Sequence, residues 1–178
     1  KEYRRQRQMC IRDRFMNPTA LTSLTWAGGA VSLNNQIVYI ASSRGYIYKS
    51  TDSGTSYLQL TNSGHRIWSG IASDDTGTIV AATVNNGYIY ISNDSGASFN
   101  AVTSMGSTTW NSIDMSPDGK YIAASNGATK IAYSSDFGAT WAWQTPGGTT
   151  LRGVAISSDG TKLAVVDLQA YLYLSSDS

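Results

Sequence analysis

The sequence predicts an all-β fold, a partial β-propeller made of four-stranded antiparallel blades of about 42 residues each. Three observations lead to this fold class. An eight-residue motif recurs at a constant spacing, every repeat unit contains four short strand-like segments, and Gly, Asn or Asp turns separate those segments. Ser, Thr, Gly, Tyr and Ile are abundant while Glu occurs once, so the composition favours strands over helices.

The recurring motif reads Ser-x-Asp-x-Gly-x-Ser/Thr-aromatic, and we call it the Asp motif. Complete copies begin at residues 50, 92 and 134, which is a spacing of 42 in both intervals, and a fourth copy begins at residue 175. A fixed period of this length is typical of repeat architectures. The motif positions are Ser50, Asp52, Gly54 and Tyr57; Ser92, Asp94, Gly96 and Phe99; Ser134, Asp136, Gly138 and Trp141; and Ser175 and Asp177 in the fourth copy.

Each residue of the Asp motif has a physical role in a turn between two strands. The Asp can accept hydrogen bonds from backbone N–H groups that have no partner in the sheet. The Gly can adopt a left-handed backbone conformation at no steric cost. The closing aromatic residue carries about 150–250 Å² of surface that needs burial between sheets. We therefore expect the Asp of each copy to accept backbone hydrogen bonds and the closing aromatic residue to be largely buried.

The chain divides into units that each begin with an apolar strand, at Trp26, Trp68, Trp110 and Leu151. A turn, a second strand, another turn, a third strand and the Asp motif then follow in the same order. Residues 15–178 form the propeller portion in this alignment. Residues 15–25 are the last strand of a preceding blade, residues 26–67, 68–109 and 110–150 are complete blades, and residues 151–178 are an incomplete blade.

The first fourteen residues differ from the rest of the chain. They contain six Lys or Arg residues, two acids and Cys10, which is the sole cysteine. Phe15 lies 42 residues before Tyr57, so the repeat resumes at Phe15 in the middle of a unit. We interpret residues 1–14 as a non-native or disordered basic segment of the kind that sequencing artefacts introduce. A basic arm that binds nucleic acid or anionic lipid is the alternative, and we expect no nucleic-acid partner.

The Asp motif resembles the Asp-box, or bacterial neuraminidase repeat, whose pattern is Ser-x-Asp-x-Gly-x-Thr-Trp. The resemblance covers residues 15–178 and rests on three complete copies in register. It implies a propeller in which the motif is the turn between the third and fourth strands of a blade, away from the ligand face. It leaves the function open, because Asp-box propellers include sialidases, xyloglucanases, sorting receptors and photosystem assembly factors.

In a propeller, the turns between second and third strands and the connections between blades lie on one face, which we call the loop face. The Asp motifs and the first turns of the blades gather on the opposite face. The Trp residues of the first strands, at positions 26, 68 and 110, could stack on sugars, although packing between blades is the favoured role for them. Polar surface is the favoured role for the single His. The candidate binding residues on or near the loop face are Arg44, His65, Arg66, Trp68, Trp110, Arg152 and Asp167.

The sequence does not contain a recognisable catalytic or metal site. Glycoside hydrolysis needs a pair of carboxylates, or a Tyr nucleophile with a Glu partner in sialidases, which also use three Arg residues. The propeller portion has no Glu and only three Arg residues, none of them in a sialidase Phe/Tyr-Arg-Ile-Pro motif. Calcium loops need several carboxylates, whereas each Asp motif offers one. We expect no catalytic residue, no metal and no cofactor.

These observations favour a non-catalytic module that binds or scaffolds a protein or a glycan, secreted or at the cell surface. The alternatives are a fragment of a secreted glycoside hydrolase, sialidase-like or xyloglucanase-like, with catalytic residues outside this chain, and a propeller like the photosystem assembly factors. The sequence shows no run of 18 apolar residues, so we expect no membrane span. Further blades of a longer chain or self-association would cover the terminal sheet faces. An open arc is favoured over a ring closed by pairing of the strands near Phe15 and Tyr171.

Overall fold

The computed structural model describes residues 21, 24–169 and 171–175, and these residues form fifteen strands and two short 3₁₀ helices. The first sheet contains β1 (Trp26–Val31), β2 (Val38–Ser42), β3 (Ile47–Ser50) and β4 (Leu58–Leu60). The second contains β5 (Trp68–Ser73), β6 (Val80–Val84), β7 (Ile89–Ser92) and β8 (Asn100–Val102). The third contains β9 (Trp110–Met115), β10 (Ile122–Asn126), β11 (Ile131–Ser134) and β12 (Ala142–Gln144). The fourth contains β13 (Leu151–Ile156), β14 (Leu163–Asp167) and β15 (Leu172–Leu174).

Every sheet is an antiparallel meander, in which each strand pairs with the next one along the chain. The helices η2 (Thr61–Ser63) and η3 (Thr103–Met105) follow the fourth strands of the first two sheets. The pairing between first and second strands is irregular at the residue that opens each unit, for example between Trp68 and Gly70. The predicted all-β fold is confirmed: the described chain is a partial β-propeller with almost no helix.

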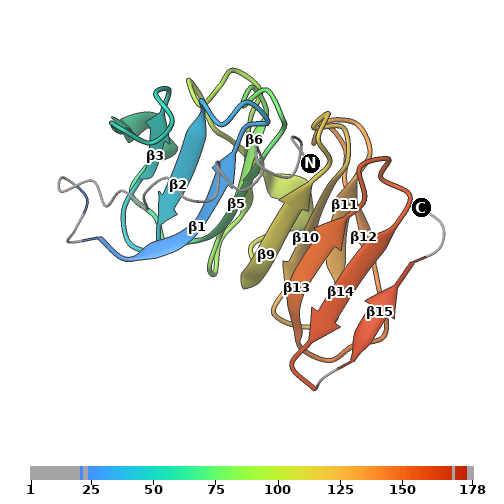
Figure 1. Ribbon diagram of the computed structural model, residues 1–178. Helices are drawn as coiled ribbons and strands as arrows, with labels where there is room; N and C mark the ends of the chain where they lie inside the picture. Colours follow the sequence, from blue (N-terminus) through green and yellow to red (C-terminus); the bar gives the residue numbers. More distant parts are fainter. Residues whose placement is uncertain (1–20, 22–23, 170, 176–178) are drawn as a thin grey trace.

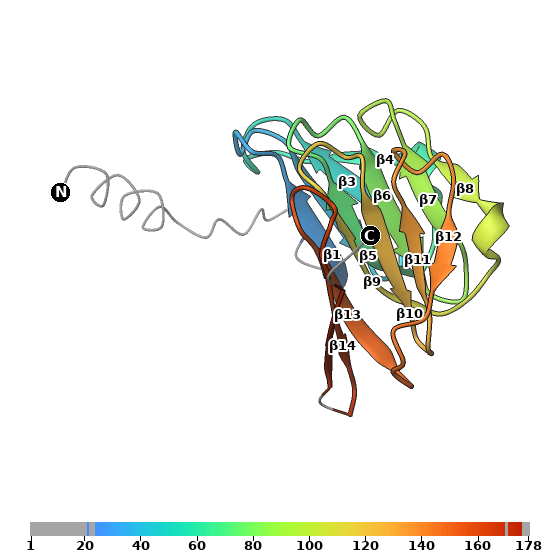
Figure 2. The same ribbon diagram turned by 90° about the vertical axis from the view of Figure 1, so that its right-hand side faces the viewer.

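The sheets lie face to face in an open arc (Figure 1). Strand β5 contacts β1 on one side and β9 on the other, and β9 in turn contacts β13. Figure 2 shows the first strands β1, β5, β9 and β13 gathered on one side of the molecule, with β8 and β12 on the opposite side. The first and fourth sheets therefore form the two ends of the arc. The strand predicted from Phe15 to residue 20 lies outside the described residues, and so does the pairing with the Tyr171 strand that the less favoured closed ring would need.

Three hydrophobic clusters fill the spaces between neighbouring sheets. The cluster between the first and second sheets includes Ile47 and Trp68, the next includes Ile89 and Trp110, and the third includes Ile131 and Leu151. A small sheet of short strands carries apolar side chains on both of its faces. It therefore needs a neighbouring sheet on either side to bury them. The core of the protein is consequently a series of layers between blades.

The Asp motif forms the same hydrogen-bonded turn in each complete copy. In the second copy, Asp94 Oδ1 accepts bonds from the backbone N–H of Ser98 at 2.8 Å and from the hydroxyl of Ser92 at 2.8 Å. Asp94 Oδ2 accepts from the Ser98 hydroxyl at 2.6 Å, and the Ser92 hydroxyl in turn accepts from the N–H of Gly96 at 2.8 Å. The first and third copies repeat these bonds, so the side chains of the motif pair backbone N–H groups of the same turn.

The motif contains two consecutive left-handed residues. The Gly has φ of 85°, 85° and 81° in the three copies, as its conformational freedom predicts. The residue before it is also left-handed, although it is Ser53, Ser95 or Phe137, with φ between 57° and 60°. Its N–H donates to a carbonyl in the first turn of the same blade, as from Ser95 to Thr78 at 2.9 Å. This bond places the motif and the first turn on the same face of the arc.

The closing aromatic residues are buried over most of their surface, as expected, although none of the three is fully buried. Phe99 packs against the cluster between the first and second sheets, and Trp141 packs against the cluster between the second and third. Tyr57, Phe99 and Trp141 stand at the entrance to the fourth strand, which is the outer edge of each blade. One side of each ring therefore stays in contact with solvent.

The hydrogen bonds of the Asp motif predict loss of stability in acid. Bonds from the Ser98 hydroxyl and N–H hold the pKa of Asp94 to about 2, below its usual value of 3.8, and Asp52 is held to about 2 in the same way. A carboxylate with a lowered pKa in the folded state stabilises the fold above pH 3.8, and that stabilisation is lost as pH falls toward 2. We expect the melting temperature to fall between pH 4 and pH 2.

The variant that tests this prediction is Asp94→Asn. Its control is Asp75→Asn, which removes a carboxylate outside the Asp motifs. Asp94→Asn should lower the melting temperature at pH 6 and reduce the further fall in acid, because that carboxylate no longer titrates. Calorimetry or circular dichroism across the pH range provides the measurement. Identical acid profiles for wild type and Asp94→Asn would contradict the role assigned to the Asp94 hydrogen bonds.

Candidate functional site

The loop face is built from paired loops that fix one another. Between the first and second sheets, the N–H of Arg66 donates to the carbonyl of Gly45 at 2.8 Å, and the N–H of Gly45 donates back at 3.0 Å. Gly87 and Thr108 form the same reciprocal pair between the second and third sheets. Each turn between second and third strands is thus tied to the connection that leads into the next blade. This arrangement gives the loop face a fixed backbone.

Arg66 packs into the rim of the first interface between sheets. Its guanidinium carbon lies 4.4 Å from the centre of the Tyr90 ring and 5.9 Å from that of Trp68. The side chain is half-buried, and its Nε is buried without a hydrogen-bond partner among the described residues. Cation–π contact of this kind contributes to packing. Arg66 therefore packs mainly at the contact between blades, and only part of its surface is accessible to a ligand.

Arg44 and His65 are exposed on either side of the Gly45–Arg66 pair. The His65 ring meets that of Tyr46 edge to face, with centres 5.6 Å apart and planes at 86°. Both side chains belong to the first sheet and its connection to the second. Among the predicted binding residues, these two are exposed to solvent and adjoin the same backbone pair.

The two Trp residues predicted as candidates for sugar stacking are buried, and that binding role is wrong. Trp68 and Trp110 are each 1% exposed. The indole N–H of Trp68 donates to the carbonyl of Gly45 at 3.1 Å, and that of Trp110 donates to Gly87 at 3.0 Å. The equivalent Trp26, on the first sheet, is 41% exposed. The two buried residues pack between blades, which is the alternative that the sequence favours.

Arg152 and Asp167 lie on the fourth sheet, apart from the other candidates. Arg152 is exposed on β13, while Asp167 is 7% exposed at the end of β14. Asp167 Oδ1 accepts bonds from the N–H groups of Gln169 at 2.8 Å and Tyr171 at 3.1 Å, and Oδ2 is buried with no hydrogen-bond partner among the described residues. Asn126 makes the same kind of turn in the third sheet. Asp167 is therefore a turn residue, and the seven candidates do not form one site.

Most carboxylates in the described chain accept hydrogen bonds from the backbone. Outside the Asp motifs, Asp74 accepts from the N–H of Ile79 at 2.8 Å. Bonds from Ser157 and Thr161 hold the pKa of Asp159 to about 2. The oxygens of these carboxylates act as hydrogen-bond acceptors within the fold. The residues with such bonds are Asp52, Asp74, Asp94, Asp114, Asp118, Asp136, Asp159 and Asp167.

Polar residues on the inner strand β9 were missed by the sequence analysis. Asp114 Oδ2 accepts a hydrogen bond from the N–H of Ile156 at 2.9 Å, which joins the third sheet to the fourth. The Asn111 side chain donates to the carbonyl of Leu151 at 2.7 Å. A signal was present, because Asp114 stands between the apolar residues Ile113 and Met115 of a first strand. These residues align neighbouring blades and do not form a carboxylate pair.

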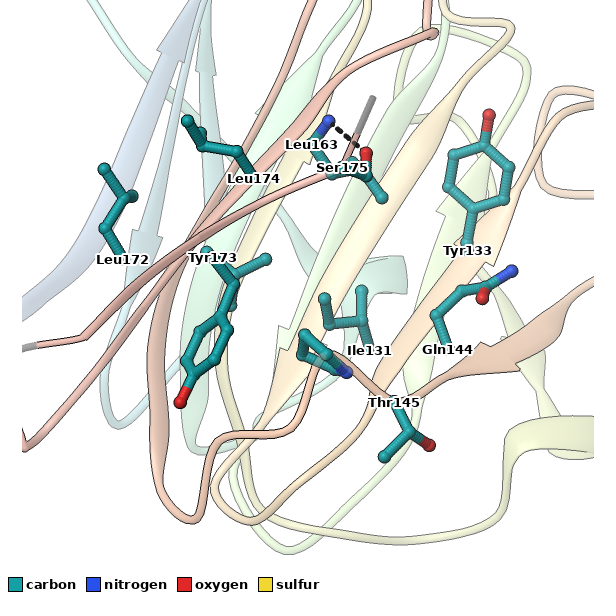
Figure 3. A pocket seen from close by; sticks show the side chains of 11 residues that line it. Ile131, Tyr133, Gln144, Thr145, Leu163, Leu172, Tyr173, Leu174 and Ser175 are labelled. Carbon is teal, nitrogen blue, oxygen red and sulfur yellow. Dashed lines mark hydrogen bonds between the residues drawn. The ribbon is translucent and has the colours of Figure 1, made fainter. Parts of the chain in front are cut away.

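A cavity of about 470 Å³ opens between the third and fourth sheets (Figure 3). Figure 3 shows Tyr173 projecting from β15 on the side opposite Leu172 and Leu174, as alternation along a strand requires. The Ser175 hydroxyl accepts a bond from the N–H of Leu163 at 2.9 Å at one edge. None of the lining residues is charged, and they are Ile131, Tyr133, Gln144, Thr145, Pro146, Leu163, Val165, Leu172, Tyr173, Leu174 and Ser175.

Solved structures with the same fold include enzymes and a protein complex. An ancestral GH74 enzyme matches 86% of this chain and 23% of its own length, with a TM-score of 0.70 and 18% identity. A chain of the nidogen/laminin complex matches 82% of this chain and 57% of its own length, with a TM-score of 0.69 and 16% identity. A GH74 enzyme of Niastella koreensis matches 80% of this chain and 26% of its own length, with a TM-score of 0.61 and 19% identity.

Identities this low show a shared fold alone, and this chain spans only 23% of the first of these structures. No family model matches the sequence, and no curated protein matches it. In the part of the chain that the structure describes, no cluster of three or more His, Cys, Asp or Glu residues could hold a metal ion. No helix among the described residues has the length and apolar character needed to cross a membrane.

The packing of the first-strand Trp residues predicts unequal effects of the same substitution. Trp110→Phe removes the indole bond to the Gly87 carbonyl, which keeps its bond from the Thr108 N–H, and it removes side-chain volume from a fully buried site, so we expect a loss of about 1–3 kcal/mol in unfolding free energy. Trp26→Phe, at the exposed end of the arc, should cost within about 0.5 kcal/mol. Urea denaturation of the two variants measures the difference. Equal losses would show that the interface between blades does not determine the role of these residues.

Proposed function

We propose that this protein is a non-catalytic β-propeller module of the Asp-box type that binds or scaffolds a protein or a glycan, in a secreted or cell-surface setting. The observation that supports this role most directly is the use of its carboxylates. Eight Asp residues accept hydrogen bonds from backbone N–H groups within turns or between blades. Acids held in this way maintain the fold, and a hydrolase needs a pair that faces its substrate.

The loop face is the proposed ligand surface. Its backbone is fixed by the reciprocal bonds of Gly45 with Arg66, so a ligand would meet a preformed surface. Arg44 and His65 are exposed there, and no carboxylate of the described chain is paired with either of them in a hydrogen bond. An anionic group on a glycan or protein suits such a surface, because Arg binds carboxylates and sulfates through two parallel N–H donors.

A glycan array and a hydrolysis assay test the proposal together. We expect retention of acidic glycans that weakens by about tenfold in the Arg44→Ala, His65→Ala double variant, since a guanidinium cation and an imidazole hydrogen-bond donor are lost. Lys120→Ala, Lys162→Ala is the matched control with two cations removed elsewhere, and it should retain binding. Incubation with xyloglucan and with sialyllactose should release no sugar. Release that depends on protein concentration and disappears in an Asp→Asn variant would overturn the non-catalytic role.

A part of a glycoside hydrolase is the second candidate function. Two of the solved structures with this fold are GH74 enzymes, and this chain spans 23% and 26% of their lengths. On this hypothesis, the catalytic acids belong to blades outside the chain, and the blades described here supply only substrate contacts. Activity that appears when the chain is extended to further blades, and that requires acids in those blades, would favour the hydrolase over the binding module.

A further inference from the structure

We infer that a second cavity, at the outer rim between the second and third sheets, binds the acetamido group of an N-acetylated sugar. This cavity has a volume of about 290 Å³ and lies beside β8, on the outer side of the molecule in Figure 2. One wall comes from β7, β8 and η3, and the other is the Asp motif of the third sheet at Gly138 and Ala139. All four strands of both sheets are described, so both walls are complete. The inference concerns a different surface from the loop face and does not rest on the function proposed above.

The equivalent space between the first and second sheets shows which chemistry this position accepts. There, the side-chain amide of Asn62 donates a hydrogen bond to the carbonyl of Gly96 at 3.0 Å and a second to that of Ala97. The ammonium group of Lys49 donates to the carbonyl of Ser95 at 2.8 Å. A carboxamide therefore fits between η2 and the facing Asp motif, and it pairs with the carbonyls of that motif.

The second sheet has side chains without these N–H donors at the same two positions. Counting 42 residues along the chain, Ser104 corresponds to Asn62 and Ile91 corresponds to Lys49. The shorter Ser104 side chain does not fill the place of the amide, and the cavity lies there. The carbonyl of Ala139, on the facing wall, accepts no hydrogen bond from the described residues. An unpaired backbone acceptor thus faces a space that holds an amide in the neighbouring interface.

Polar side chains surround this acceptor on the side of the second sheet. Four residues with amide or hydroxyl groups line the cavity, and none of these side chains is hydrogen-bonded to another described residue: Asn93, Asn100, Thr103 and Ser104. Amides and hydroxyls can each donate and accept hydrogen bonds. Val102 shares a face of β8 with Asn100, and both it and Ile91 belong to the apolar layer between the sheets. The cavity therefore combines an apolar floor with an uncharged polar rim.

The chemistry of the ligand follows from these groups. An acetamido group offers an N–H for the Ala139 carbonyl, a carbonyl oxygen for the Ser104 hydroxyl and a methyl group for the apolar floor. The hydroxyls of the sugar ring match the amides of Asn93 and Asn100. No charged residue lines the cavity, so a neutral ligand is favoured over an ion. The volume is close to the lower limit of small-molecule sites, about 300 Å³, which suits a single N-acetylhexosamine residue of a glycan.

An NMR titration of the whole chain with methyl N-acetyl-β-glucosaminide tests the inference. We expect saturable shifts at the backbone amides of Ser104 and Ala139 and at the side-chain amides of Asn93 and Asn100. The dissociation constant should be about millimolar, because one sugar residue offers few atoms for contact. Methyl β-glucoside has a hydroxyl in place of the acetamido group. It should bind at least about tenfold more weakly, because the amide N–H and the methyl group are missing.

Substitutions of two Ser residues provide the matched protein variants. Ser104→Asn gives the second sheet the amide that the first sheet has at Asn62, so it should occupy the site and weaken sugar binding by at least about tenfold. The same substitution should raise the melting temperature, because the new amide pairs with the Ala139 carbonyl. Ser107→Asn is the control, at an exposed position of the same connection outside the cavity lining, and it should change neither property.

Four outcomes would overturn the inference. These are equal affinity for the two sugars, equal effects of the two Ser variants, shifts confined to residues away from the cavity, and no saturable shift at concentrations well above millimolar. The amide of N-acetylasparagine distinguishes a sugar from a peptide. Binding of this compound as tightly as the N-acetylated sugar would assign the cavity to peptide amides and overturn the sugar class, whereas binding at least about tenfold weaker supports it.

Discussion

Face-to-face packing between neighbouring sheets is the interaction on which the rest of this structure depends. A sheet of strands three to six residues long has no interior of its own, so its apolar side chains are buried only when another sheet covers them. Ile47 and Ile89 are fully buried because a later sheet covers each of them, whereas Leu172, at the same position in the fourth sheet, is 60% exposed. Burial therefore depends on a residue's place in the arc as much as on its type.

Polar groups in this protein are organised to allow that packing. The turns bring backbone N–H groups close to the edges of the layers, and the Asp motif pairs them locally through one carboxylate and one or two hydroxyls. Buried polar groups without partners cost free energy, so a turn that satisfies its own donors can lie against an apolar layer. Most of the described Asp side chains are used in this way, as hydrogen-bond acceptors for the backbone.

The repeat made much of the fold predictable from the sequence. The period of 42 residues placed the units, and alternating apolar residues with Gly turns placed the strands. Positions that depend on a neighbouring unit were harder to predict. The left-handed conformation of Phe137 has no signal in its residue type, and the incomplete burial of Trp141 depends on the geometry of an edge strand.

The candidate binding residues were less predictable than the fold. Trp is a residue type that often lines sugar-binding surfaces, but Trp68 and Trp110 are buried in the core. The position of the preceding blade determines whether such a residue is exposed or buried, and the sequence does not show that position. Arg66 is similar, because the Tyr90 ring that it covers lies 24 residues further along the chain. Sequence patterns report local periodicity well, but they do not report which loops from different blades meet.

The hydrogen bonds between blades also bear on how such a chain can change in length during evolution. The indole of Trp68 reaches the carbonyl of Gly45, 23 residues earlier, and the indole of Trp110 reaches that of Gly87 across the same separation. A duplication or deletion of one whole unit would leave every such pair intact, because each residue would find an equivalent partner at the same separation. A gene of this kind can gain or lose blades by unequal crossing-over without a new interface having to arise.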